Sequence, residues 1–270
     1  MNIVQIHERT RFWLDRVATA RFDSFDIDNA LNIALNDLVD AKYNGSKLNP
    51  GDSFQKTQKI RDDLSSIVKI GESGSTITIS NSTGSTLITK AGLPADFRYL
   101  LCIAFYETAT IKHNCWPLSY DRENVVEPNP YRRVRTGPFP KLYYNESNLG
   151  IKITHPFSGN PNKVVIYYLA NPVQYSYGIE RLPAFTFTVN PTSVIVTSET
   201  VVYNAVTYLL GTKFNITSPA SFTSGTVISD FTESDINVNL HEQIARRAAI
   251  NALITIGERE KSLDLIKIFD

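Results

Sequence analysis

The side chains with the clearest chemical potential are two cysteines and four histidines. His113 lies two residues before Cys115 and eleven after Cys102, the one arrangement that suggests a metal site. Structural zinc sites bring paired ligands at short spacing, as in Cys-x-x-Cys. This sequence has one short pair and no second, so we predict no metal and no cofactor, with Cys102 buried in an apolar core.

The other histidines suggest no catalytic constellation. His7 and His241 lie in helical segments among charged residues, so we predict that both face solvent, and His155 precedes Pro156 in a turn. The sequence contains no Gly-x-Ser-x-Gly elbow, no phosphate-binding glycine loop and no His-Glu-x-x-His. We therefore expect that the chain is not an enzyme.

One basic cluster, Arg132, Arg133 and Arg135, lies in the proline-rich segment 129–140. The guanidinium fork suits both carboxylates and phosphates. These arginines could therefore contact an acidic partner or passing DNA. Alternatively they could pair with the nearby acidic residues at 121, 123 and 127 and hold an irregular segment in place, which we favour slightly.

The charge balance limits the functional classes. The 270 residues include 27 basic and 27 acidic side chains. Zero net charge argues against a protein whose main function is binding nucleic acid, because affinity for nucleic acid comes mostly from cationic side chains that neutralise phosphates. It also removes the repulsion that keeps proteins apart. No stretch approaches the ~20 apolar residues of a membrane helix, and we predict neither a membrane span nor a signal peptide.

Three helices are expected before Gly71. The first ends near Ala20, and the second carries an apolar stripe from Ile27 to Val39 at three- and four-residue spacing. Ser24 or Asp26 would cap the second helix, and Asn44-Gly45 would stop it. The third carries an apolar face from Ile60 to Val68.

From residue 75 the hydrophobic period changes to two, which is typical of strands. A hairpin is predicted from Ser75–Ser80 and Thr86–Thr89. The long run Lys163–Ala170 is apolar on both faces, so neither face should meet water. The further expected strands are Phe97–Thr108, Lys141–Tyr144 and Gly150–Thr154.

Residues 177–236 read as an inserted β module. Between Leu182 and Ser229 the only charged residues are Glu199 and Lys213. Strand edges with so few charges are poorly protected against pairing with other chains. We favour a surface covered by neighbouring subunits; the alternative is that Thr, Ser and Asn alone keep it soluble. The expected strands are Phe185–Val189, Ser193–Thr197, Thr200–Tyr203 and Lys213–Thr217.

A final helix is predicted from Asn239 to Gly257, with Asn239 and Glu242 spaced as a capping box. Small residues on its apolar face would allow close approach of another helix, either the chain's own second helix or a neighbour's. This predicted packing face comprises Ala245, Ala248, Ala249 and Ala252.

Together these patterns predict an α+β fold, with a helical bundle joined to an antiparallel β domain. The expected domains are a core at 1–176, the inserted all-β module at 177–236, and a C-terminal helix at 237–270 that returns to the core.

Four segments, in this order, resemble those of a known family. They are Ile27-Asp-Asn-Ala-Leu-Asn-Ile-Ala-Leu-Asn36, Gly92-Leu-Pro-Ala-Asp-Phe-Arg-Tyr-Leu100, the strands from Tyr143 to Pro172, and Leu240-His-Glu-Gln-Ile-Ala-Arg-Arg-Ala-Ala249. The chain resembles the head-to-tail connector proteins of tailed bacteriophages, in particular the ring proteins of crAss-like short-tailed phages. The module at 177–236 departs from a minimal adaptor of this family.

The resemblance implies a structural virion protein that is assembled in the host cytoplasm and located in the neck. It would form a ring of identical subunits, a dodecamer in related connectors, around the DNA channel. Its partners would be the portal protein and adjacent ring or tail proteins, with the genomic DNA nearby. The aromatic β content leaves a second hypothesis, a glycan-binding adhesin or tail-spike module that binds through tyrosines of 175–208.

Overall fold

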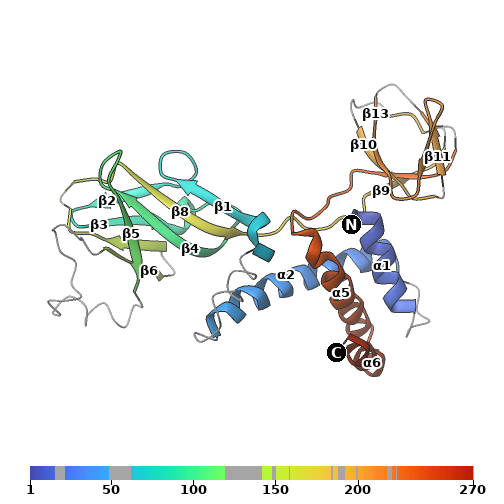
Figure 1. The fold of residues 1–270 in the computed structure, drawn as a ribbon, viewed down its shortest axis with the longest axis horizontal. Coiled ribbons are helices and arrows are strands. Elements are labelled where there is room, and N and C mark those ends of the chain that lie inside the picture. Colours follow the sequence, from blue (N-terminus) through green and yellow to red (C-terminus); the bar gives the residue numbers. More distant parts are fainter. Residues whose placement is uncertain are drawn as a thin grey trace. The chain divides into compact units, whose positions relative to one another are not determined.

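The computed structural model describes residues 1–15, 22–48, 62–118, 142–147, 150–157, 159–183, 185–187, 192–198, 200–217, 221–222 and 224–269. Helices and mainly antiparallel sheets confirm the α+β class (Figure 1). The chain forms two compact units. We call residues 1–66 and 172–270 the helical unit, and residues 67–171 the sheet unit.

This division differs from the predicted domains, which joined 1–176 into one core. The segment after Asn171 belongs with the helices because its backbone is held by α2 (Ser24–Leu48). Asn32 donates to the carbonyl of Tyr175 at 2.9 Å and accepts from its amide at 2.7 Å. The β module and the C-terminal helices lie in the same unit, so the sheet unit is the insertion between two halves of the helical unit.

The core of the helical unit is α1 (Ile3–Asp15), α2 and α5 (His241–Thr255), which pack on one another (Figure 1). The predicted cap of α2 is wrong, since Asp23 accepts the Asp26 amide at 2.8 Å. The predicted stop is also wrong, and α2 continues through Asn44-Gly45 to Leu48. A glycine inside a helix costs only about 1 kcal/mol, so it does not force an end.

Helix α5 packs through small side chains. Ala245, Ala248, Ala249 and Ala252 are all buried, and α5 contacts α1 and α2 of its own chain. The predicted capping box is absent, because a 3₁₀ turn at Val238–Leu240 precedes α5 and Asn237 accepts the Asn239 amide instead. The helix ends before Gly257, whose φ is +83°. A further helix, α6 (Arg259–Phe269), follows it and was not predicted.

The third predicted helix is wrong from Val68 onward, and its part before residue 62 lies outside the described residues. After a short 3₁₀ turn at Ser65–Ile67, residues Val68–Glu72 form strand β1. This strand pairs antiparallel with β8 (Lys163–Ala170), with Ile70 opposite Tyr167. The long-range pairing therefore overrides a local pattern that suited a helix.

The sheet unit is one eight-stranded sheet in the order β1-β8-β4-β5-β6-β7-β3-β2 (Figure 1). Neighbours are antiparallel except β5 and β6, which are parallel. Strand β8 is buried at nearly every position, as its apolar faces predicted. The other strands are β2 (Ile79–Ser82), β3 (Ser85–Thr89), β4 (Phe97–Tyr106), β5 (Lys112–Pro117), β6 (Leu142–Ser147) and β7 (Gly150–Thr154).

The β module has its own core, which includes Phe187, Val194, Phe214 and Phe222. It contains a four-stranded sheet, β13-β10-β14-β9, and a hairpin, β11-β12. Three of the predicted strands are present within a residue of their expected bounds, and the fourth extends beyond Phe187 outside the described residues. The strands are β9 (Ile179–Arg181), β10 (Thr192–Val196), β11 (Thr200–Tyr203), β12 (Val206–Leu209), β13 (Lys213–Ile216) and β14 (Val227–Ser229).

The two chain segments that lead into and out of the module are paired. Ser176 and Thr232 exchange two backbone hydrogen bonds of 3.0 and 2.9 Å. Among the described residues, no helix is both long and apolar enough to cross a bilayer.

The alanine face of α5 generates a stability prediction. Ala248→Leu should lower the free energy of unfolding by ~1–3 kcal/mol, because added methylenes overpack a tight helix contact. Chemical denaturation followed by circular dichroism measures this loss. Ala41→Leu is the matched control, since Ala41 is exposed on α2. Equal stability of the two variants would contradict the packing.

The paired segments generate a second prediction. Replacing residues 178–230 with a short Gly-Ser linker should leave the helices folded, because Ser176 and Thr232 already bring the two ends together. Far-ultraviolet circular dichroism should retain the helical signal and a cooperative melt. Loss of the helical transition would mean that the module is part of the helical core.

Candidate functional site

The residues singled out from the sequence are not brought together in one site. Arg132, Arg133 and Arg135 lie outside the described residues, so their contact with a partner or DNA stays a prediction. The alanine face of α5 is used inside the chain's own bundle, as described above. It is therefore not a surface for another subunit.

The prediction that Cys102 is buried is wrong, since Cys102 is exposed, and Cys115 is the buried cysteine. A register shift between Leu100 and Cys102 interrupts the alternation of β4, and such a bulge changes which face a side chain takes. Burial raises the pKa of the Cys115 thiol to about 12, so it remains protonated at neutral pH. In the part of the chain that the structure describes, no three His, Cys, Asp or Glu side chains gather as metal ligands.

The prediction that His7 and His241 face solvent is wrong, since both are buried. His7 Nε2 lies 2.8 Å from Asp28 Oδ1, and Asp28 Oδ2 accepts the amide of Tyr177 at 2.9 Å. This contact ties α1 and α2 to the segment leading into the module. The signal was present in the sequence, because His7 belongs to a buried stripe with Ile3, Thr10 and Leu14 at helical spacing.

Glu242 links α1 and α5 through several donors. Arg9 donates two hydrogen bonds to its carboxylate, at 2.7 and 3.0 Å. Trp13 and Arg246 donate to Oε1 at 3.2 and 3.0 Å. Burial by itself would raise the pKa of Glu242, but the hydrogen bonds from Arg9 and Arg246 outweigh it and hold that pKa below the usual value. The carboxylate is thus a structural anchor that is charged at neutral pH.

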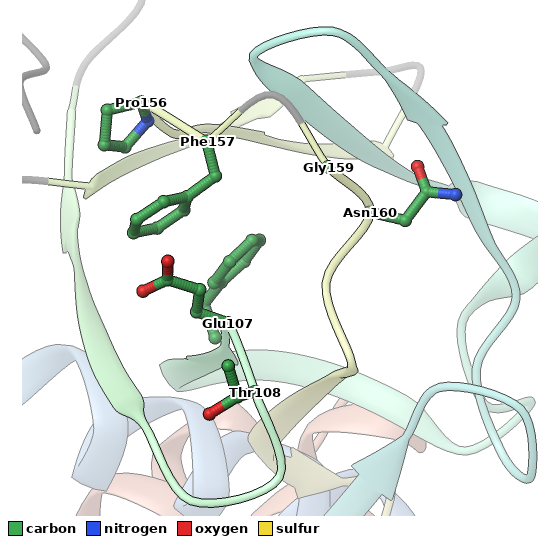
Figure 2. Close-up of a pocket in the computed structure, with 7 residues that line it drawn as sticks. Glu107, Thr108, Pro156, Phe157, Gly159 and Asn160 are labelled. Carbon is green, nitrogen blue, oxygen red and sulfur yellow. The ribbon is translucent and has the colours of Figure 1, made fainter.

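A pocket of about 380 Å³ lies in the sheet unit. It lies between the end of β4 with its following turn and the segment that follows β7 (Figure 2). The seven described residues that line it are Phe105, Glu107, Thr108, Pro156, Phe157, Gly159 and Asn160. Its two walls are far apart in sequence and meet because the second wall leads into β8, which pairs with β4 and places Lys163 opposite Tyr106.

Charged and aromatic groups meet at this pocket. Glu107 Oε2 lies 3.1 Å from His113 Nε2. The ring of Phe157 stacks on His113 at 5.2 Å, and on Phe105 at 5.7 Å between centroids. The Glu107 carboxylate lies beside the Phe157 ring (Figure 2). The sequence pattern around His113 suggested only a metal ligand, and its carboxylate partner across the β4–β5 turn was not predicted.

His155 supports the pocket from the core side. Its ring lies 4.8 Å from Phe105 and 6.0 Å from Phe157. Its Nε2 is 3.3 Å from the Thr86 hydroxyl. Burial lowers the pKa of His155 below the ordinary value, so the imidazole is neutral at neutral pH and behaves as part of the aromatic core.

The second feature is a set of exposed apolar side chains on several strands and on α6. In the helical unit Leu263 is 55% exposed on α6, and Leu182, just after edge strand β9, is 66% exposed. In the sheet unit Trp116 is 63% exposed. Further exposed members are Ile254, Ile256, Ile266 and Ile268 near α6, Ile179 and Phe185 near β9, and Val68 and Ile70 on edge strand β1.

The tyrosines that could have formed a glycan platform are placed otherwise. Tyr175 and Tyr203 are buried. Tyr208 stacks on Phe214 with centroids 4.0 Å apart. Tyr203 and Tyr208 belong to the core of the module, and Tyr175 is buried in the segment that leads into it. These three rings therefore offer no broad aromatic face for a sugar.

No protein-family model matches this chain, and a comparison with curated proteins found no match.

The Glu242 anchor generates a prediction. Glu242→Gln should cost about 1 kcal/mol of unfolding free energy at neutral pH, because it removes a partly exposed ionic cluster. The folded state lowers the pKa of Glu242 from 4.5, so the wild-type advantage should be present above that value and disappear as the pH falls through the lowered pKa. Urea denaturation at several pH values measures this, with exposed Glu8→Gln as control.

His155 generates a second pH prediction. The unfolded chain binds a proton at this imidazole below the ordinary pKa of 6.5, whereas the folded chain resists it. The sheet unit should therefore lose stability between about pH 7.5 and about pH 5.5. His155→Gln should reduce that loss, and His241→Gln, in the helical unit, should not. Hydrogen exchange of β7 and β8 amides reports on it, and an unchanged pH slope in His155→Gln would contradict the assignment.

Proposed function

We propose that this chain is a structural subunit of the head-to-tail connector of a tailed phage, assembled as a ring between portal and tail. The observation that carries the proposal is the exposed apolar surface on edge strands and helix ends of both units. The segments that resemble phage connector proteins supply the specific assignment.

Edge strands are natural sites of association. β1 and β9 each end a sheet in the described part of the chain, so one side of each backbone has no strand partner there. Ile70 on β1 and Ile179 on β9 are both about half exposed, at 56% and 51%. Charged side chains protect edge strands against pairing, and both strands carry some: Lys69 and Glu72 on β1, Glu180 and Arg181 on β9. The half-exposed isoleucines are therefore the part of each edge that favours an assembled state.

Helix α6 offers a second kind of surface. Leu265 is buried on one face, whereas Leu263 and Ile266 are exposed on the other. An exposed helix face of this kind, close to Ile254 and Ile256 in sequence, is typical of an interface. Closed rings need two different complementary patches on every subunit. The edge strands and α6 provide patches of different shape.

The charge balance of the chain is compatible with a large permanent interface. Permanent subunit interfaces typically bury ~2,000 Å² or more and resemble a divided core. Equal numbers of acidic and basic side chains leave little net repulsion between copies and little net attraction for DNA passing through a channel.

Assembly tests the proposal. Purified wild-type chain, mixed with the portal protein of the same phage, should form rings visible by negative-stain microscopy and mass photometry. Leu263→Lys together with Ile266→Lys should reduce assembly at least tenfold, because buried charges oppose interface formation. Asp264→Ser together with Lys267→Ser, at exposed polar positions of α6, is the matched control. A wild-type chain that stays monomeric and never binds portal would overturn the proposal.

A further inference from the structure

The pocket between the β4–β5 turn and the segment after β7 has no part in the connector proposal and can be judged by its own chemistry. We propose that this pocket binds a guanidinium group, the planar cation at the end of an arginine side chain. The inference holds whether or not the chain forms rings. It follows from the charge, the aromatic walls, and the size and rigidity of the pocket.

The pocket carries a negative charge. Among the seven described residues that line the pocket, Glu107 alone carries a charge. Its side chain is 37% exposed, and among the described residues its Oε2 makes a 3.1 Å contact with His113 Nε2. Figure 2 shows the carboxylate directed into the space beside Phe157. A carboxylate has about four acceptor positions, so it retains acceptor capacity for a forked donor.

The aromatic walls select the shape of the cation. Phe157 lies next to the Glu107 carboxylate (Figure 2), and its orientation is held by offset stacking on His113 and Phe105. A cation near an aromatic face gains further attraction. Guanidinium is planar and weakly hydrated, so it can lie against a ring while it donates to a carboxylate, whereas an ammonium is compact and strongly hydrated.

A neutral sugar fits this pocket less well. The Thr108 hydroxyl already accepts the backbone amides of Thr110 and Ile111, at 3.4 and 3.1 Å. Phe105 is only 1% exposed, so its ring offers no platform for a sugar face. A cation gains Coulomb energy and charge-assisted hydrogen bonds from Glu107, whereas a neutral sugar gains ordinary hydrogen bonds and contact with the Phe157 ring.

Size and rigidity complete the argument. A volume of about 380 Å³ is at the small end of ligand pockets and suits a single side chain or a small molecule. The turn that carries Glu107 is closed by its amide, which donates to the Ile111 carbonyl at 3.1 Å. The opposite wall is held near Asn162, whose amide donates to the Tyr106 carbonyl at 2.8 Å. A pocket formed in advance loses less entropy on binding.

Two sources could supply the guanidinium. It could be a free small molecule, or an arginine presented by another protein, including the segment Arg132–Arg135 of a second copy. The chemistry at Glu107 is the same in each case, so the experiment contains an arm for each source.

The test is nuclear magnetic resonance titration of the full chain. N-acetyl-arginine methylamide should shift the amides of residues 107–111 and 156–160 with millimolar affinity. The matching citrulline compound, which has the same shape without the charge, should bind at least about tenfold more weakly. Glu107→Gln, which keeps the shape and a polar partner for His113, should cause a similar loss. Glu260→Gln, an exposed control on α6, should cause none.

A peptide of residues 129–137 identifies the source. In one outcome the peptide binds more tightly than the single-arginine compound and loses this binding when its three arginines are replaced by glutamine. That result would support the guanidinium site, with a second copy of the chain as the donor. Equal binding would support it with a small molecule as donor. Three results would overturn the inference: arginine and citrulline binding equally, an unaffected Glu107→Gln variant, or methyl glucoside binding where arginine does not.

Discussion

Close packing of α5 against α1 and α2 is the constraint on which the rest of the chain depends. Buried alanines on α5 allow this approach, and Glu242 fixes it by accepting from Arg9, Trp13 and Arg246. Because these helices come from opposite ends of the chain, the segments between α2 and α5 must start and end at the helical core. The sheet unit and the β module are therefore both excursions from one helical framework.

Partly buried polar contacts hold the module to that framework. Asp28 connects His7 to the backbone of Tyr177, and Asn32 holds Tyr175 through two hydrogen bonds. Buried polar groups are costly without partners, so these contacts are specific to one arrangement of the helices and the segment leading into the module. The module's apolar core then needs only its own residues, which leaves its edge at β9 available for association.

The sheet unit contributes a different property, a small pocket whose charged and aromatic groups are held in place by the strands. Glu107 and Phe157 approach because β4 pairs with β8, the strand that follows the segment containing Phe157. Together with the exposed apolar side chains on β1, β9 and α6, this pocket is the feature on which our two proposals rest, one for assembly and one for cation binding.

The sequence by itself determined the α+β class and most of the elements with strong periodicity, such as α2, α5, β4, β8 and three strands of the module, because hydrophobic period is a local property. Tertiary structure decided the rest. Val68–Gly71 became a strand because β8 pairs with it, and a bulge in β4 exposed Cys102. His7 and His241 became buried because other helices and connecting segments cover them. The Glu107–Phe157 pocket could not be predicted, since its walls meet only through strand order, which pairs residues far apart in the chain and leaves no local pattern.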